Sequence, residues 1–281
     1  MKSGLKAKSS MDLEITSKEN PSYKELKSFS REKSNYLFIE GGKLLAEAIK
    51  SPLKIKKIYI DKENHLRFSS LLSECKEYEL VFMKNELLAS LFTTDTRPVH
   101  EELVIVLAEK PSWQLTDLFE TKKNLIFLEE VQDPGNLGTI IRSALAFNAG
   151  GIILSKNSVN PFNTKVIRGS AGALFNMPVV AIDDFDNFIN LVKKENYKLI
   201  ATSAVADKKI NELNLSSPFI FLFGNEGKGL SEKLVNIAHE TIAIPHSKEV
   251  ESLNLGTAVS IVLWEIYRCK GLLQQTPTNF G

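Results

Sequence analysis

Short runs of apolar residues, separated by stretches with helical spacing, recur along the carboxyl-terminal half of the chain. The clearest are LIFLEEV (125–131), GIILS (151–155), PVVAI (178–182), KLIATSA (198–204) and FIFLFG (219–224). Short continuous apolar runs are typical of strands buried on both faces, as in a parallel sheet covered by helices. The pattern therefore predicts an α/β fold with a parallel sheet.

The amino-terminal half shows the same alternation in a shorter series. Strand-like segments separated by helical patterns are YLFIEG (36–41), IKKIYID (55–61), ELVFM (79–83) and ELVIVLAE (102–109). The stretch KPSWQLTDLFETKKN then indicates a linker with a short helix. We therefore predict two domains, a smaller one over residues 12–110 and a larger one over residues 120–275.

Charge is balanced over the whole chain but not along it. The 281 residues include 35 Lys and Arg and 34 Asp and Glu, while the first 60 residues contain 13 basic and 7 acidic ones. A basic amino-terminal end can face a polyanion, although a solvated surface explains the same charges.

Cysteine and histidine are too scattered to define a disulfide framework or a metal site. Cys75 and Cys269 form no pair motif, and no histidine lies at ligand spacing with a cysteine or another histidine. The basic start is not followed by an apolar segment, and no apolar run approaches the roughly 18 residues of a membrane span. We therefore expect a cytoplasmic protein without a metal ion.

The first loop that can carry chemistry is DPGNLGTIIRSALAFNAGG, after the strand-like run LIFLEE. DPG at 133–135 is a turn signal, and we expect Asn136 to cap a helix that runs to Phe147 and exits through the glycines at 150–151. Arg142 falls among apolar residues of this helix. Such a charge needs a partner or a cavity, although an arginine whose stem lies along the core fits the same pattern.

The second loop, FGNEGKGL (223–230), places three glycines within six positions after an apolar strand. It fails the G-x-x-x-x-G-K-[ST] template of a phosphate-binding loop, and Glu226 would repel a phosphate. A glycine-rich turn at the carboxyl end of a parallel strand brings backbone close to a ligand, which a carboxylate here predicts to be neutral or cationic. A plain tight connection is the alternative.

The third stretch, IAIPHSKEVESLNLGTAVSIVLWEIYR, starts as a strand and ends as a helix. Ser252 and Asn254 stand just ahead of this helix, and both residue types are good helix caps. The helix has few polar positions, so we expect it to be buried on several faces, in the core or in a dimer. We interpret Trp264 and Tyr267 as packing residues.

Taken in order, DPGNLGTIIRSA, FGNEGKGL and IP…ESLN…A resemble the three signature motifs of the SpoU (TrmH-type) RNA ribose methyltransferases of the SPOUT class. The stretch ITSKENPSYKELKSF…FIEGGKLLAEAI resembles the family's substrate-binding domain, which is similar to ribosomal protein L30e. The resemblance covers nearly all of residues 12–270. It implies an L30e-like RNA-binding domain over 12–110 and a methyltransferase domain over 120–275 with a carboxyl-terminal trefoil knot.

The resemblance also implies a reaction and a site. The reaction would be methyl transfer from S-adenosylmethionine to a ribose 2′-hydroxyl of RNA, by a homodimer. The methyl donor would contact Gly224, Asn225, Gly229, Ile244 and Leu253. The residues that match catalytic positions of the motifs are Asn136, Arg142, Glu226, Ser252 and Asn254. A guanidinium hardly deprotonates, so we expect Arg142 to position the ribose and stabilise charge rather than act as a base.

The basic residues of the amino-terminal half gain a role from this resemblance, as phosphate contacts that position RNA without reading its sequence. The candidates, together with one arginine of the larger domain, are Lys24, Arg31, Lys54, Lys56, Lys57 and Arg168. One position departs from the family pattern, because Gly256 stands where many members have serine. A small residue is still compatible with tight packing there.

The smaller domain narrows the choice of RNA substrate. Minimal transfer-RNA members of the family lack an L30e-like domain, so its presence favours ribosomal RNA, and 23S rRNA in particular. Alternatives that stay open are a transfer-RNA 2′-O-methyltransferase, an enzyme that methylates ribosomal RNA to confer antibiotic resistance, and an idle RNA-binding assembly protein on the same scaffold. A nucleotide-binding metabolic enzyme is disfavoured by the missing phosphate loop.

Overall fold

The computed structural model describes residues 8–9, 14–29, 34–75, 77–94, 98–203, 206, 208–213 and 218–269. The chain folds into two compact units. Unit 1 comprises Met1–Ser112 and Phe162–Asn176, and unit 2 comprises Trp113–Pro161 and Met177–Gly281. The segment Phe162–Asn176, which falls inside the predicted larger domain, thus folds with unit 1.

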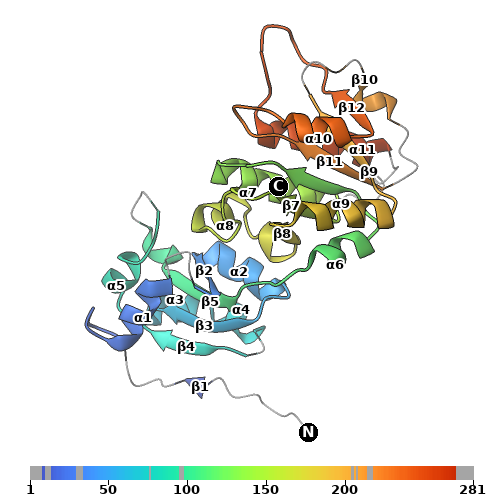
Figure 1. The fold of residues 1–281 in the computed structure, drawn as a ribbon. Helices are drawn as coiled ribbons and strands as arrows, with labels where there is room; N and C mark the ends of the chain where they lie inside the picture. Colours follow the sequence, from blue (N-terminus) through green and yellow to red (C-terminus); the bar gives the residue numbers. More distant parts are fainter. Residues whose placement is uncertain are drawn as a thin grey trace. The chain divides into compact units, whose positions relative to one another are not determined.

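Unit 1 is built on a sheet with parallel and antiparallel pairs (Figure 1). Its strands are β1 (Lys8–Ser9), β2 (Tyr36–Glu40), β3 (Ile55–Ile60), β4 (Glu79–Phe82) and β5 (Val104–Glu109). They lie in the order β1-β4-β3-β5-β2, and only the β5 pairs with β2 and β3 are antiparallel among these described strands. The helical elements are α1 (Pro21–Phe29), α2 (Gly42–Lys50), α3 (Lys62–Arg67), α4 (Ser69–Ser73), α5 (Asn85–Ala89), η1 (His100–Glu102), α8 (Thr164–Gly169) and η2 (Ala173–Phe175).

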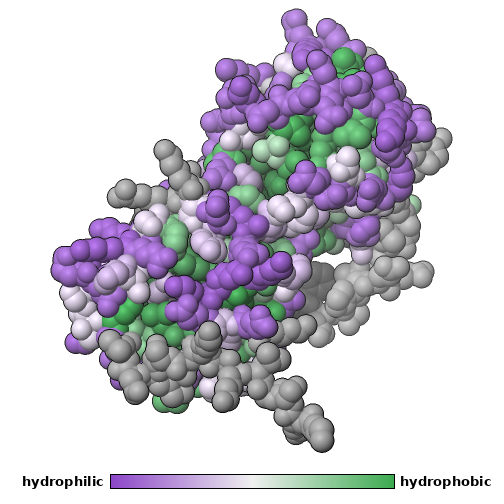
Figure 2. Space-filling model, turned by 60° about the horizontal axis from the view of Figure 1, so that its bottom comes forward, coloured by the Kyte–Doolittle hydropathy of each residue, from purple (hydrophilic) through white to green (hydrophobic). Residues whose placement is uncertain are grey.

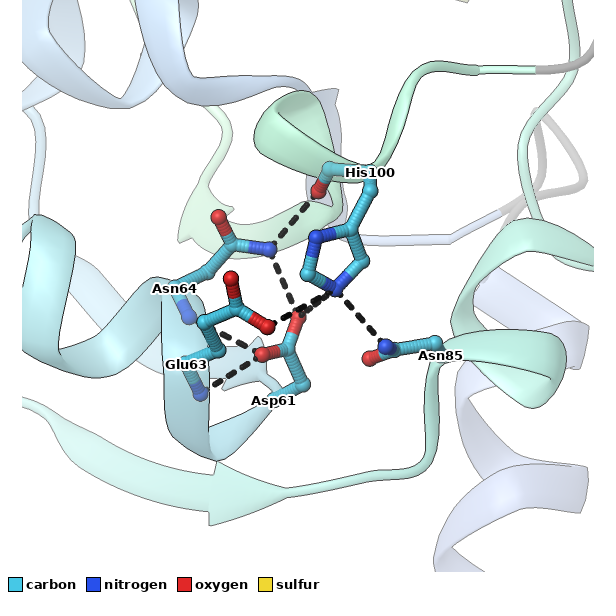
Figure 3. A network of polar contacts seen from close by, with 5 residues as sticks. All are labelled: Asp61, Glu63, Asn64, Asn85 and His100. Carbon is cyan, nitrogen blue, oxygen red and sulfur yellow. Dashed lines mark hydrogen bonds and ion pairs between the residues drawn. The ribbon is translucent and has the colours of Figure 1, made fainter.

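A polar network in unit 1 ties η1 to α3 and α5 (Figure 3). Asp61 caps α3, since its Oδ1 accepts hydrogen bonds from the backbone amides of Glu63 and Asn64 at 2.8 and 2.9 Å. The fully buried Asn64 donates to Asp61 Oδ2 at 2.6 Å and to the carbonyl oxygen of His100 at 2.7 Å. His100 Nε2 in turn lies 2.7 Å from Asn85 Nδ2. The segment that leads into β5 is therefore anchored to two helices.

Unit 2 contains the parallel sheet that the apolar runs predict. Its strands are β6 (Leu125–Leu128), β7 (Gly151–Leu154), β8 (Val179–Ala181), β9 (Lys198–Thr202), β10 (Lys208–Lys209), β11 (Phe219–Phe223) and β12 (Glu240–Ala243). The order is β10-β12-β9-β11-β6-β7-β8, with parallel pairing throughout these described strands. The helical elements are α6 (Leu115–Glu120), α7 (Pro134–Ala146), α9 (Phe185–Lys194), η3 (Ile210–Glu212), α10 (Glu232–Ile237) and α11 (Leu255–Cys269).

Burial explains why this sheet reads as apolar runs. Every residue of β6, β7 and β11 is buried, so these strands have no solvent-facing side on which polar residues could alternate. The α/β fold class with a parallel sheet is therefore confirmed, whereas the trefoil knot stays a prediction. In the register of β6 and β11, Leu128 pairs with Phe223. The loops that follow these two strands consequently leave the same edge of the sheet.

The predicted start and exit of the helix over 136–147 are wrong in detail. Asp133, not Asn136, caps α7, because its Oδ1 accepts from the Asn136 backbone amide at 2.7 Å and Pro134 supplies the first helical residue. Proline suits this position because its φ is fixed and the missing amide would have no helical partner. The left-handed residue beyond the helix is Asn148, with φ 57°.

The surface in Figure 2 is largely hydrophilic, with hydrophobic residues gathered in patches. Large apolar side chains with substantial exposure include Leu145, Ile261 and Trp264, whose exposed fractions are 39%, 36% and 43%. Within the described ranges, no helix is both long and apolar enough to cross a membrane. Among the same residues, no group of three His, Cys, Asp or Glu side chains is arranged to hold a metal ion.

Candidate active site

A chain of side-chain hydrogen bonds joins the three loops singled out in the sequence. Asn136 Nδ2 donates to Glu226 Oε1 at 3.1 Å, and Asn254 Nδ2 donates to Asn136 Oδ1 at 2.8 Å. The two contacts span 90 and 118 residues of sequence, so the fold alone creates them. The structure thus brings together three of the five predicted catalytic residues, with the Asn136 amide at the centre.

Asn136 is available for this role because it is not the helix cap. Its backbone amide is already bonded to Asp133, and its side chain projects from the first turn of α7 with both amide ends in use. The sequence contained a signal for this arrangement. An Asp directly ahead of a Pro matches the preferred cap and first helical residue, and it places the asparagine inside the helix.

The Glu226 carboxylate also holds the loop that precedes α7. The backbone amide of Asp133 donates to its Oε1 at 3.3 Å, and the amide of Gln132 donates to its Oε2 at 3.4 Å. An exposed carboxylate that faces two backbone N–H groups and a side-chain amide is locally well compensated. This accounts for an acidic residue in the middle of a glycine-rich loop.

Asn254 has two functions in the structure. Its Oδ1 accepts from the Thr257 amide at 3.2 Å, and its carbonyl oxygen accepts from the Ala258 amide at 2.8 Å, so it caps α11. Its Nδ2 is the group that bonds Asn136. The capping role and the site role predicted for this residue are therefore compatible, because they use different atoms.

The glycine-rich loop between β11 and α10 is closed by its own backbone. The amide of Asn225 donates to the carbonyl oxygen of Gly229 at 3.1 Å, and the amide of Gly229 donates back at 2.9 Å. A Cβ atom on Gly224 would lie 2.0 Å from the Gly229 carbonyl carbon, so only glycine fits there. Gly229 has φ 69°, and a Cβ atom on it would meet nothing within 4 Å. The loop is therefore tight inside and open at Gly229.

The Asn225 side chain fixes the shape of this loop and joins it to the next one. Its Oδ1 accepts from the amides of Gly227 and Lys228 at 2.9 and 3.2 Å. Its Nδ2 donates to the carbonyl oxygen of Glu130 at 2.9 Å. Glu130 has φ 49°, an uncommon conformation for a residue other than glycine and one that is concentrated at functional sites. Nothing in the sequence indicated this residue.

Arg142 does not take part in the network. It is exposed on α7, six residues after Asn136, which corresponds to about 9 Å along the helix axis and about 120° around it. Within the described part of the chain, its guanidinium makes no hydrogen bond or ion pair. Its donors are consequently available to a ligand outside the protein.

The side chains of Ser252, Ile244 and Leu253 make no hydrogen bond to this network among the described residues. Ser252 is exposed, while Ile244 and Leu253 are half-buried. The carbonyl oxygen of Ile244 lies 2.8 Å from His246 Nδ1. The two aliphatic side chains are therefore partly covered apolar groups.

Gly256 lets α11 approach α7 closely. The residue is buried, and a Cβ atom on it would lie 3.3 Å from the Thr139 side chain and from Asn254 Oδ1. Four residues further along, Ser260 Oγ lies 2.7 Å from Ser143 Oγ. The expectation of tight packing at Gly256 is confirmed by this spacing.

Four lysines predicted to contact RNA lie in unit 1 with carboxylate neighbours. Lys24 Nζ lies 2.5 Å from Glu19, and Lys57 Nζ lies 3.4 Å from Glu79. Lys56 and Lys54 both face Glu109, at 2.8 and 3.8 Å. The hydrogen bond between Lys56 and Glu109 raises the pKa of the lysine and lowers the pKa of the glutamate.

Of the two arginines predicted to contact RNA, the structure describes only Arg168. Arg31 lies outside the described residues. Arg168 lies on α8 in unit 1, where its Nη1 donates to the Glu40 carboxylate. Its guanidinium is thus bonded to a buried acidic group that the sequence did not single out.

Comparison with known proteins defines the class of enzyme to which this site belongs. The model of the SpoU rRNA methylase family matches residues 123–264. An uncharacterized tRNA/rRNA methyltransferase of Synechocystis is 30% identical over 268 residues, which is 90% of this chain and 93% of the relative. The 23S rRNA (guanosine(2553)-2′-O)-methyltransferase RlmP of Bacillus subtilis is 28% identical over 257 residues, 90% of this chain and 98% of the relative.

A solved structure agrees with these matches. The AdoMet-bound rRNA methyltransferase from Sinorhizobium meliloti superposes with a TM-score of 0.79 at 26% identity, covering 92% of this chain and 98% of that one. Fold and sequence together define an RNA methyltransferase. The chain belongs to the SpoU rRNA methylase family.

Proposed function

We propose that this protein transfers a methyl group from S-adenosylmethionine to a ribose 2′-hydroxyl of ribosomal RNA, with 23S rRNA as the substrate. The observation that carries the proposal is the hydrogen-bonded chain Glu226–Asn136–Asn254. This chain links three loops through the side-chain amide of Asn136 at the carboxyl edge of the sheet. Packing of a hydrophobic core does not require such a polar link. Such an edge is where open α/β sheets bind their ligands.

The loops fit the methyl donor by their chemistry. The open side of Gly229 lets a ligand approach the backbone, and the half-buried Ile244 and Leu253 offer apolar surface to an adenine ring. Gly224 and Asn225 keep the loop in shape, and the Glu226 carboxylate disfavours an anionic ligand. S-adenosylmethionine supplies a methyl group on a cationic sulfur, so its charge suits this loop.

The protein's part in the reaction is alignment and charge stabilisation. The 2′-hydroxyl must lie in line with the methyl group, and its oxygen gains negative charge as the proton leaves. The exposed Arg142 guanidinium has donors that no described residue uses, and these could bind this oxygen or a neighbouring phosphate. Asn136, held at both ends of its amide, would order the loop that faces the ribose, while Ser252 and Asn254 would shape the pocket.

Unit 1 would bind the RNA backbone. Its lysines pair with exposed carboxylates, and exposed ion pairs contribute little to stability because water and salt screen them. They can therefore exchange a carboxylate for a phosphate at little cost, with release of counterions from the RNA. We assign this role to residues 12–110 and the methyltransferase role to residues 120–275, whose carboxyl-terminal part would form the trefoil knot.

Two features favour ribosomal RNA over transfer RNA. The chain has an amino-terminal unit beside the methyltransferase unit, and minimal transfer-RNA members of the resembled family lack such a domain. RlmP, which matches over nearly its whole length, is a 23S rRNA 2′-O-methyltransferase.

The active form would be a homodimer joined through α7 and α11. These helices expose Leu145, Ile261 and Trp264. The ring centroid of Trp264 lies 5.7 Å from that of Phe147, so the aromatic surface is held in place by its neighbours.

Tritium transfer from labelled S-adenosylmethionine to purified ribosomal and transfer RNA tests the proposal. We expect label in ribosomal RNA and its loss with Arg142→Ala, while RNA binding is largely kept. Lys194→Ala, an exposed cation on α9 outside the site, is the matched control. Turnover that survives in Arg142→Ala would refute the assigned mechanism, and RNA binding without any transfer by the wild type would favour the idle assembly protein.

A further inference from the structure

A buried carboxylate in unit 1 is engaged from several sides. Glu40 ends β2, and its side chain is 1% exposed. Its two oxygens accept hydrogen bonds from the backbone amide and the hydroxyl of Thr93 and from Arg168 Nη1. A buried charge is tolerated only with such compensation, and removal of one partner leaves the other charge unpaired. Glu40, Thr93 and Arg168 therefore hold one another in place within unit 1.

Both ends of α8 are bound at this point. Thr93 Oγ1 lies 2.8 Å from Thr164 Oγ1 and accepts from Arg168 Nη1 at 2.9 Å. Thr164 and Arg168 are four residues apart, so they share one face of the helix. Helix α8 contacts β2, and Arg168 on this face reaches Glu40 at the end of that strand. The carboxylate and the Thr93 hydroxyl consequently fix both the position and the rotation of α8.

The chain just ahead of α8 is bound to the loop that leads into the candidate active site. The Val159 amide donates to the Val131 carbonyl oxygen at 2.8 Å, and Gln132 Nε2 donates to the Asn157 carbonyl oxygen at 2.6 Å. The Glu130 amide donates to Ser155 Oγ at 2.8 Å. Residues 155–159 thus lie alongside the loop 129–133 and are hydrogen-bonded to it.

Only a few residues separate these two sets of contacts. From Val159 the chain reaches Thr164 in five residues, a span of at most about 18 Å when fully extended. At its other side, the loop 129–133 is held by Glu226 through the amides of Gln132 and Asp133. The segment 155–169 is therefore fixed in unit 1 at one end and in the active-site loops of unit 2 at the other.

We propose that Glu40 is a positioning residue for methyl transfer. By holding α8 through Arg168 and Thr93, it restrains residues 155–161 and with them the loop 129–133 that supports Asn136 and Glu226. The order of the candidate active site then depends on a residue of the unit assigned to RNA binding. The kinetic part of this inference rests on the proposed function, whereas the structural part does not.

Hydrogen exchange of the full-length protein tests the structural part. We compare Glu40→Gln with Glu102→Gln, a matched change of another unit 1 carboxylate, whose Oε2 accepts from the Gly42 amide at 2.9 Å. With Glu40→Gln, we expect amide exchange in residues 129–133 and 155–161 to rise about tenfold or more, and exchange in β9 to stay unchanged. Glu102→Gln should alter neither loop.

An increase confined to residues 162–176 would overturn the proposal, because the restraint would then end within unit 1. If Glu40→Gln loosens the whole protein, Thr93→Val decides instead, since it keeps the charge pair and removes the hydroxyl beside Thr164. The same two-loop pattern in Thr93→Val supports the proposal, and unchanged exchange in both loops contradicts it.

Steady-state kinetics test the functional part. For Glu40→Gln we expect kcat to fall about tenfold, with the KM for RNA and the Kd for S-adenosylmethionine within about twofold of wild type. Arg168→Gln should cause a similar loss, and the double variant should be no worse than either single one, since the pair acts as a unit. A raised KM with unchanged kcat would overturn the positioning role and leave Arg168 as an RNA contact. A wild type without any methyl transfer would refute the proposed function, while the exchange experiment would still test the restraint.

Discussion

Glu226 Oε1 accepts a hydrogen bond from Asn136 Nδ2 at 3.1 Å, across 90 residues of sequence. The same carboxylate accepts from two backbone amides of the loop before α7. It therefore acts as a clamp between the glycine-rich loop and the loop that carries Asn136.

Replacing this carboxylate by its amide tests the clamp. In Glu226→Gln, one end of the new side chain is a donor that faces backbone donors, so at least one contact is lost. We expect turnover to fall about tenfold or more, which corresponds to about 1.4 kcal/mol of transition-state stabilisation. Glu232→Gln on α10 is the control. Equal turnover of the two variants in the tritium assay would show that the clamp is not needed.

The glycine-rich loop offers a matched pair of glycine substitutions. Gly224→Ala would place a Cβ atom 2.0 Å from backbone, whereas the nearest atom to a Cβ on Gly227 is Asn225 Oδ1 at 3.6 Å. We expect Gly224→Ala to abolish binding of S-adenosylmethionine and Gly227→Ala to change its Kd less than about threefold. Calorimetric titration of both variants measures this difference. Normal donor binding by Gly224→Ala would contradict the described loop.

Two buried tyrosines predict opposite responses to loss of the hydroxyl. Tyr59 is fully buried, burial raises its pKa, and its hydroxyl has no partner among the described residues. Tyr197, whose pKa burial raises to about 12, donates to the Lys123 carbonyl oxygen at 3.0 Å. We expect Tyr59→Phe to raise the free energy of unfolding by about 1 kcal/mol and Tyr197→Phe to lower it by about 1 kcal/mol. Urea unfolding measures both, and a destabilised Tyr59→Phe would reveal a missing partner.

The proposed dimer predicts a change of mass on mutation of its surface. Trp264 is 43% exposed on α11, and a lysine there would bring a charge into an apolar contact. We expect sedimentation of Trp264→Lys to give a monomer where the wild type gives a dimer. Lys194→Ala on α9 should sediment as the wild type does. A wild type that is already monomeric would exclude the dimer.

The sequence predicted the parallel sheet because its strands are buried on both faces. β6, β7 and β11 contain no position where a polar residue would be tolerated, so each one is a visible apolar run. Asn136, Glu226 and Asn254 could be selected from motifs alone. Their direct contact could not, since it depends on how loops 90 and 118 residues apart return to one edge of the sheet.

The partners of the charged residues could not be predicted either, because these contacts also depend on how the chain folds. Lys54 and Lys56 face Glu109 because β3 and β5 pair in antiparallel register, and local sequence does not reveal which strands are neighbours. In the sequence, Glu40 is simply a polar residue at the end of a strand. In the structure, its carboxylate accepts a hydrogen bond from Arg168, 128 residues away. The cap of α7 could have been predicted from local sequence, because the Asp133-Pro134 pair matches a cap followed by the first helical residue. The assignment of the cap to Asn136 was wrong.

The most direct test of the central claim is a map of ribose methylation in ribosomal and transfer RNA from cells with and without this gene. We expect one 2′-O-methyl group to disappear from ribosomal RNA and to return when the wild-type gene, but not Arg142→Ala, is restored. Loss of a methyl group from transfer RNA alone would contradict the proposed substrate. An unchanged map in both RNAs would contradict the claim that this protein methylates the RNA of its own cell.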